Sequence, residues 1–253
     1  MDYQTLRLTL ERGIARLTLL RPELDLRCLR ELDDAVSALS ETDGLRVLIL
    51  DSAGPDFAQG WSADAVAALS RPPETLDPAN EPFGRLAALP VPVVAALKGA
   101  VRSGGLELAL ACDIRLAAEG ARFAMPETEL GLIPLAGGGQ RLARIAGRGA
   151  ALAMLLAGEE LDAAAALRCG LVSRVLAAGE LEAGTQRLAT TIASRGPLGV
   201  RLAKEAIHRG LDMTLAQGLR YELDLSILLQ TTADRAEGVR AFLEKRPPNF
   251  ESR

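Results

Sequence analysis

Alternating apolar and polar positions open the chain and predict a β-hairpin. Residues 5–20 read TLRLTLERGIARLTLL, with a turn signal at Glu11-Arg12-Gly13 between two alternating runs. A change of period follows, and apolar residues recurring at spacings of three and four predict an amphipathic helix over residues 28–41: Leu29, Leu32, Val36 and Leu39. The short apolar runs at 45–51 and 92–97 are expected to be buried strands, and two more strands are expected at 113–119 and 121–125.

Turn residues and a short helix separate these strands. Residues 52–60 are expected to form a loop, and the proline-rich segment 70–81 another loop, either a surface linker or the edge of a lid. A Gly-rich turn precedes a short helix at 105–111. The first two-thirds of the chain therefore predicts repeated strand–strand–helix units.

The remainder of the pattern is mainly helical. Asp162 is a candidate N-cap of a helix that Gly170 ends, and a last strand is expected over 171–176. Four further helices are expected: 179–194, 197–210, 214–229 and 233–245. We interpret residues 1–195 as a core with the ligand site and residues 196–253 as a helical region for oligomerisation.

Composition narrows the classes of function. The chain is 49% hydrophobic, has a net charge of −4 and contains no basic run, which argues against nucleic-acid binding. No stretch is long and apolar enough to span a bilayer, and the first residues do not resemble a signal peptide. Three widely spaced cysteines suggest reduced thiols and a cytoplasmic protein: Cys28, Cys112 and Cys169.

The single histidine excludes several common sites. His208 lies in KEAIHRG, an exposed or partly exposed helical stretch, where a structural or surface role is expected. A Ser-His-Asp or Cys-His site would require it, yet no nucleophile-elbow pattern accompanies it. His-based zinc sites are therefore nearly excluded as well, and the chemistry considered below for the two glutamates requires no metal and no redox cofactor.

Two carboxylates stand in apolar surroundings. Glu107 lies in SGGLELALACD, in the first turn of the expected helix and after Gly104, and Glu127 follows a proline in MPETELG. Unpaired N–H groups at a helix start suit an oxyanion, and glycines let a ligand approach the backbone. Taken singly, each glutamate also fits an ordinary role, as a helix-terminus charge or a solvated loop residue.

Nearly the whole chain resembles the enoyl-CoA hydratase/isomerase (crotonase) family. The resemblance rests on the order and spacing of four stretches: LRVLILDSAGPDFAQG, PVVAALKGAVRSGGLELALACDIRLAAEGARFAMPETELGLIPLAGGGQRLAR, AGEELDAAAALRCGLVSRVL and EGVRAFLEKRPPNF. It implies an α/β fold, a crotonase-like spiral of ββα units with a C-terminal helical region that builds a homotrimer, often a hexamer. It also implies an acyl-CoA thioester as ligand, with coenzyme A entering only as part of the substrate.

The resemblance assigns roles to particular residues. The two glutamates of family hydratases match Glu107 and Glu127. The two backbone N–H groups that bind the thioester oxygen match Gly104 and Trp61, which follows Gly60. Hydration of a thioester-conjugated double bond develops enolate charge on that oxygen, which such donors stabilise, and two carboxylates around one water can take and deliver the protons.

Four features depart from the family pattern. Trp61 and Ser62 stand where many members have a small residue and Asp, so the acyl or pantetheine channel is expected to be reshaped. Leu135 replaces a small or acidic residue near the water of hydratases. The stretch from Arg21 is shorter than usual where the backbone helps to hold the CoA nucleotide. Four basic residues are candidates to contact the CoA phosphates, and the alternative is that they are solvated charges: Arg21, Arg27, Lys245 and Arg246.

The resemblance and its departures leave three interpretations of the function. The leading interpretation is an enoyl-CoA hydratase that converts a 2-enoyl-CoA to a 3-hydroxyacyl-CoA in fatty acid metabolism. A double-bond isomerase, or another enolate reaction of the family, is the first alternative, although isomerases typically use one acid at the position of Glu127. A non-catalytic CoA-binding paralogue is the second, because of the departures.

Overall fold

A computed structural model describes residues 3–69 and 81–251. Its main sheet has six strands in the order β1-β2-β4-β6-β8-β11. The predicted hairpin is confirmed, since β1 (Leu6–Glu11) and β2 (Ile14–Leu19) pair antiparallel with Leu6 opposite Leu19. The other four strands pair in parallel: β4 (Val47–Ser52), β6 (Val93–Leu97), β8 (Ile114–Ala118) and β11 (Arg174–Leu176). All of β6 is buried, which explains its unbroken apolar run.

Short strands beside the main sheet complete the predicted units. β3 (Glu23–Leu24) pairs with β5 (Gly60–Trp61), and β9 (Arg122–Ala124) pairs with both β7 (Ala100–Arg102) and β10 (Leu161–Asp162). The chain passes from a main-sheet strand to a short strand and then to a helix, and repeats this path. The predicted spiral of ββα units is confirmed.

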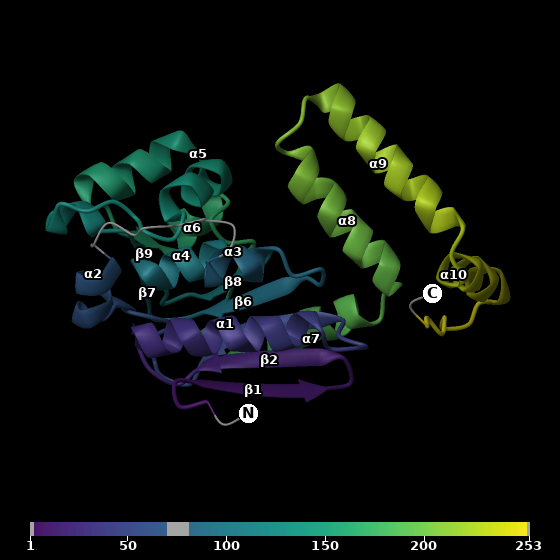
Figure 1. The fold of residues 1–253 in the computed structure, drawn as a ribbon, viewed down its shortest axis with the longest axis horizontal. Coiled ribbons are helices and arrows are strands. Elements are labelled where there is room, and N and C mark those ends of the chain that lie inside the picture. The colour runs from purple at the N-terminus through teal and green to yellow at the C-terminus, as the bar shows by residue number, and fades with distance from the viewer. Residues whose placement is uncertain (1–2, 70–80, 252–253) are drawn as a thin grey trace.

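Helices surround these sheets (Figure 1). The predicted first helix is α1 (Leu26–Ser40), and the predicted N-cap Asp162 accepts a hydrogen bond of 2.7 Å from the N–H of Ala165 in α6. The other core helices are α2 (Ala63–Leu69), α3 (Pro82–Ala87), α4 (Gly104–Leu110), α5 (Gly138–Ala157), α6 (Ala163–Arg168), α7 (Leu181–Ala193) and the 3-10 turns η1 (Glu127–Leu130) and η2 (Ala178–Glu180).

The sequence did not predict α2, α3 or α5. The expected loop at 70–81 lies outside the described residues except for Glu81, which caps α3 by accepting hydrogen bonds from the N–H groups of Phe83 and Gly84.

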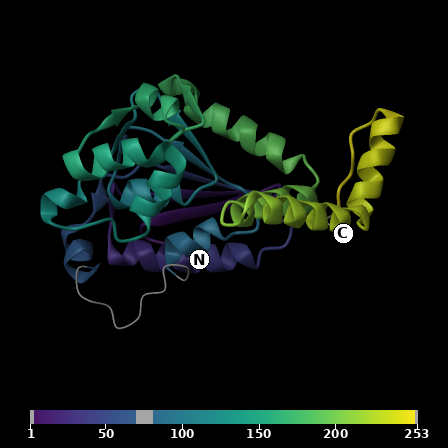
Figure 2. The ribbon, with the colours of Figure 1, turned by 90° about the horizontal axis from the view of Figure 1, so that it is seen from above.

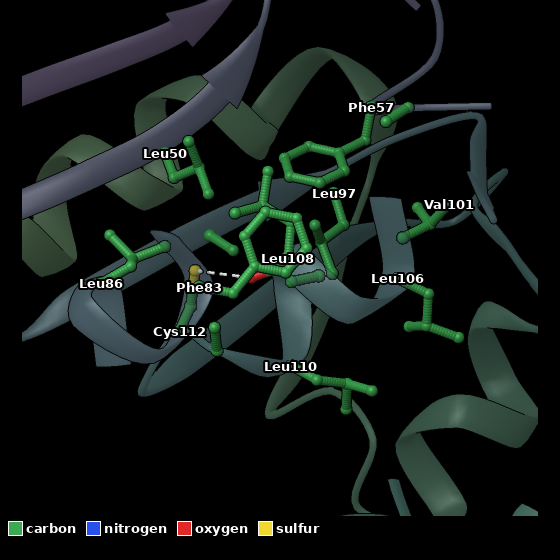
Figure 3. Close-up of a cluster of buried hydrophobic side chains, with 14 of the residues drawn as sticks. Leu50, Phe57, Phe83, Leu86, Leu97, Val101, Leu106, Leu108, Leu110 and Cys112 are labelled. Carbon is green, nitrogen blue, oxygen red and sulfur yellow. Dashed lines mark hydrogen bonds between the residues drawn. The ribbon is translucent and has the colours of Figure 1, made fainter. Parts of the chain in front are cut away.

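The core lies between the main sheet and α1, α3 and α4. Figure 3 shows leucines of β4, β6 and α4 packed around two phenylalanines, Phe57 and Phe83, both fully buried. Cys112 belongs to this cluster, and its thiol lies 3.6 Å from the carbonyl oxygen of Leu108. This packing buries the side chains of α4 in the core.

Three helices leave the core at the C-terminus: α8 (Pro197–Gly210), α9 (Leu215–Gln230) and α10 (Ala233–Glu244). α8 and α9 run side by side, and α10 follows at the end of α9, away from the sheets (Figures 1 and 2). Asp113 anchors α8 to the core, with Lys204 Nζ at 2.7 Å and His208 Nε2 at 2.8 Å. His208 thus makes a structural contact. Within the described residues, no helix is both long and apolar enough to cross a membrane.

Candidate active site

The start of α4 lies beside the loop that leads into α2. Ser103 has a positive φ of 49°, which a non-glycine residue rarely adopts, and its N–H donates to the carbonyl of Ala124 at 3.0 Å. Gly104 follows as the first helical residue, so its N–H has no acceptor carbonyl within the helix. A Cβ placed on Gly60 would lie 3.0 Å from Cβ of Ser103. The two predicted oxyanion segments, at 60–61 and 103–104, are therefore neighbours.

Glu107 is fully buried and accepts three hydrogen bonds. Its Oε1 accepts from the N–H groups of Ala136 at 2.7 Å and Gly138 at 2.9 Å, and its Oε2 accepts from the indole Nε1 of Trp61 at 3.3 Å. Burial raises the pKa of Glu107, and the charge of Glu127 raises it further, while these three donors act in the opposite direction. The apolar sequence around Glu107 correctly indicated burial, but not these donors.

The turn before α5 forms the cradle for this carboxylate. Gly137 adopts a left-handed φ of 79°, which turns the chain so that the N–H groups on both sides face Glu107. A Cβ on Gly138 would lie 2.5 Å from Cγ of Glu107, so only glycine fits there. Arg141 donates to the carbonyl of Ala136 at 2.6 Å and steadies the turn. Leu135, which is half-buried, immediately precedes these donors.

Glu127 is buried like Glu107, but its carboxylate lacks the hydrogen bonds that Glu107 accepts. It is the first residue of η1 and only 4% exposed, yet no donor among the described residues is in hydrogen-bonding geometry to either carboxylate oxygen. Burial is the largest influence and raises the pKa of Glu127, whereas the neighbouring hydroxyl of Ser103 lowers it. A buried carboxyl group with free oxygens is suited to exchange protons with a bound molecule.

The side chain of Trp61 turns toward α4. Besides its bond to Glu107, the indole stacks on Phe83, with ring centroids 5.7 Å apart and planes 8° from parallel. A Cβ on Gly104 would lie 2.3 Å from Cε2 of Trp61, so the ring covers this glycine directly. The indole therefore lies against the start of α4, and a reshaped acyl or pantetheine channel stays a prediction.

Three other candidate residues make local contacts of their own: Ser62, Arg21 and Arg27. Ser62 caps α2, since its Oγ accepts from the N–H of Ala65 at 3.2 Å; this supplies a local hydrogen bond where the family has Asp. Arg21 and Arg27 are exposed and flank β3, which pairs with β5; Arg21 lies 3.5 Å from Asp25 and Arg27 donates to Gln4.

Lys245 is not brought to the glutamates within one chain. It is exposed and follows α10, which lies apart from α4 (Figure 1). In the described parts of the chain, no group of three His, Cys, Asp or Glu residues is placed to hold a metal ion.

Comparisons with known proteins identify the family of the chain. The model of the enoyl-CoA hydratase/isomerase family matches residues 9–253. The chain is 36% identical to a probable enoyl-CoA hydratase (echA8) of Mycobacterium tuberculosis and 36% identical to a crotonyl-CoA hydratase of Syntrophomonas wolfei, with full coverage of both chains in each case. An enoyl-CoA hydratase structure from Bacillus anthracis superimposes with a TM-score of 0.89 at 35% identity, covering 99% of this chain and 100% of the other.

These matches extend over the whole spiral core and the C-terminal helices. The sequence motifs, the full-length match and the fold therefore all indicate the same family. The chain belongs to the enoyl-CoA hydratase/isomerase family and has the crotonase fold.

Proposed function

We propose that this protein is an enoyl-CoA hydratase, which adds water across the double bond of a 2-enoyl-CoA to give a 3-hydroxyacyl-CoA. The observation that carries the proposal is the pair of buried glutamates, one held by three donors and one held by none, beside the open N-terminus of α4. No cofactor is needed beyond the coenzyme A of the substrate.

The thioester oxygen is bound by the backbone N–H groups of Gly104 and Trp61. As water adds to carbon 3, negative charge moves onto this oxygen, and two oriented donors lower the barrier. Removing one such donor typically costs about 10²–10³ in rate. The dipole of a helix start contributes in the same direction.

Protons move through the two glutamates. Glu107 takes a proton from water. Burial raises its pKa, which makes its carboxylate a stronger base, and its three hydrogen-bond donors hold the carboxylate in place. Burial raises the pKa of Glu127 more than the Ser103 hydroxyl lowers it, which favours the neutral form, so this residue delivers a proton to carbon 2. The hydroxyl group bonds to carbon 3, and solvent later returns both glutamates to their starting states.

One observation favours an alternative within the family. The indole of Trp61 occupies Oε2 of Glu107, which leaves Glu127 as the carboxylate with two free oxygens. A double-bond isomerase, or another enolate reaction, requires only one such carboxylate to carry a proton between carbons.

A direct assay separates these functions. With crotonyl-CoA, a hydratase removes the ultraviolet absorbance of the conjugated thioester and yields a product heavier by one water. An isomerase instead generates that absorbance from a 3-enoyl-CoA. Absence of either change with short and long substrates, together with retained acyl-CoA binding, would identify a non-catalytic CoA-binding paralogue and contradict the proposal.

We further propose that the protein acts as a cytoplasmic homotrimer or hexamer in fatty acid metabolism. Residues 196–253 would form the oligomerisation region, which follows from the exposed apolar side chains of α9 and α10. In such an assembly, Arg21, Arg27 and a neighbouring subunit's copy of the residue at position 245 would meet the CoA phosphates.

A further inference from the structure

The Trp61 indole contacts residues at both ends of the proposed reaction site. One edge covers Gly104, where an added Cβ would lie 2.3 to 2.7 Å from three ring carbons. Its Nε1 lies 3.3 Å from Oε2 of Glu107. The ring therefore lies against both the proposed donor of the thioester oxygen and the proposed base.

The indole is held in this position from several sides. One face stacks on Phe83, which is fully buried and lies in the first turn of α3, next to the cap formed by Glu81. The backbone of Trp61 belongs to β5, and Ser62 directly after it caps α2. Displacing the ring breaks the stacking and the hydrogen bond to Glu107, so the indole is a fixed wall.

This wall restricts where an acyl chain can run. A thioester oxygen at the N–H of Gly104 and reacting carbons near Glu107 and Glu127 place the following carbons of the acyl chain beside the indole. We propose that Trp61 is a specificity-determining residue whose ring closes the acyl subsite and limits the protein to short acyl chains. This inference rests on the proposed function, because it assumes an acyl thioester bound at Gly104.

Binding of saturated acyl-CoAs tests the inference without turnover. Butyryl-, hexanoyl- and octanoyl-CoA carry no double bond, so hydration cannot occur and their dissociation constants report the subsite alone. A subsite that buries each added methylene gains about fourfold in affinity per methylene. In the parent protein we expect less than a threefold gain from butyryl- to octanoyl-CoA. In Trp61→Ala we expect a gain of at least tenfold over the same series.

Two further variants make the result specific. Trp61→Phe keeps an aromatic wall and should retain most of the parent preference for short chains. Trp61→Leu, which is smaller than indole but still apolar, replaces the Ala variant if that protein does not fold, and should shift the preference in the same direction as Ala. Circular dichroism and the melting temperature establish folding for each variant.

The parent protein carries its own reporter. Trp61 is the single tryptophan of the sequence, so intrinsic fluorescence reports this position alone. Butyryl-CoA should change the emission, whereas coenzyme A without an acyl group should change it much less. An equal response to both would mean that the acyl group does not approach the indole, and would overturn the inference.

The outcomes separate the inference from the proposed function. Acyl-CoA binding with an unchanged chain-length preference in both the Ala and Leu variants would overturn the role of Trp61, whatever the hydration assay gives. A shifted preference in a protein that hydrates no enoyl-CoA would support the role of Trp61 and reject the hydratase. A parent that binds no acyl-CoA would reject both.

Discussion

At the scale of single residues, Glu107 and Glu127 differ in their hydrogen bonds. Both are buried and both have a raised pKa, but among the described residues only Glu107 accepts hydrogen bonds on its carboxylate oxygens. The apolar sequence around Glu107 was enough to predict burial, because no basic residue stands one helical turn away. The donors were not predictable, because Ala136 and Gly138 lie about thirty positions further on, and the indole of Trp61 arrives from another ββα unit.

The raised pKa of Glu127 predicts a pH-dependent stability. Between its ordinary value of 4.5 and its higher folded value, the unfolded chain loses this proton while the folded protein keeps it. The contribution of Glu127 to the free energy of unfolding is therefore fully present below pH 4.5 and is lost as the pH rises through the folded pKa.

Denaturant unfolding at several pH values checks this linkage. We compare the free energy of unfolding of Glu127→Gln with that of the parent protein. The difference, variant minus parent, should increase with pH above 4.5, because only the parent loses stability there, and should then level off. A difference that is independent of pH would show that Glu127 has an ordinary pKa in the folded protein.

Close packing between Gly104 and Trp61 predicts a coupled response. Gly104→Ala places a methyl group against the ring and should destabilise the protein by about 1–3 kcal/mol, as overpacking does. In a Trp61→Ala background the same change should cost much less, because the ring is gone. Strictly additive effects in this double-mutant cycle would contradict the packing described.

At the scale of elements, periodicity predicted the hairpin, α1 and the C-terminal helices, but not α5. The reason is that α5 contains glycines at its start and middle, and Gly147 interrupts it with φ 83° and ψ 156°. Glycine weakens a helical pattern, so periodicity alone does not indicate this helix. Its position is set by tertiary contacts, including the cradle for Glu107.

Two adjacent glycines of α5 offer a matched pair of variants. Gly138→Ala would drive a methyl group to 2.5 Å from Cγ of Glu107, so a loss of activity and of about 1–3 kcal/mol of stability is expected. Gly139→Ala meets nothing closer than 3.6 Å and should be neutral or stabilise by up to about 1 kcal/mol. Thermal unfolding measures the stability of each variant, and the hydration rate measures its activity. Equal effects at Gly138 and Gly139 would contradict a specific role of Gly138 in holding Glu107.

At the scale of the whole molecule, α9 exposes apolar side chains one helical turn apart. Leu215, Leu219 and Leu223 are 78%, 57% and 52% exposed, which is costly for a surface in water. We expect light scattering to give the mass of a trimer or hexamer. Leu219→Asp with Leu223→Asp should reduce that mass, whereas the control Glu222→Gln on the same helix should not. A monomeric parent protein at micromolar concentration would refute the assembly.

The most direct measurement of the central claim is the turnover number for crotonyl-CoA hydration in the parent, Glu107→Gln and Glu127→Gln. Gln retains the shape of each side chain but exchanges no proton, so each folded variant should lose at least about 10² in kcat, with smaller changes in acyl-CoA affinity. A parent enzyme that hydrates crotonyl-CoA, with either Gln variant retaining its full kcat, would contradict the shared role of Glu107 and Glu127.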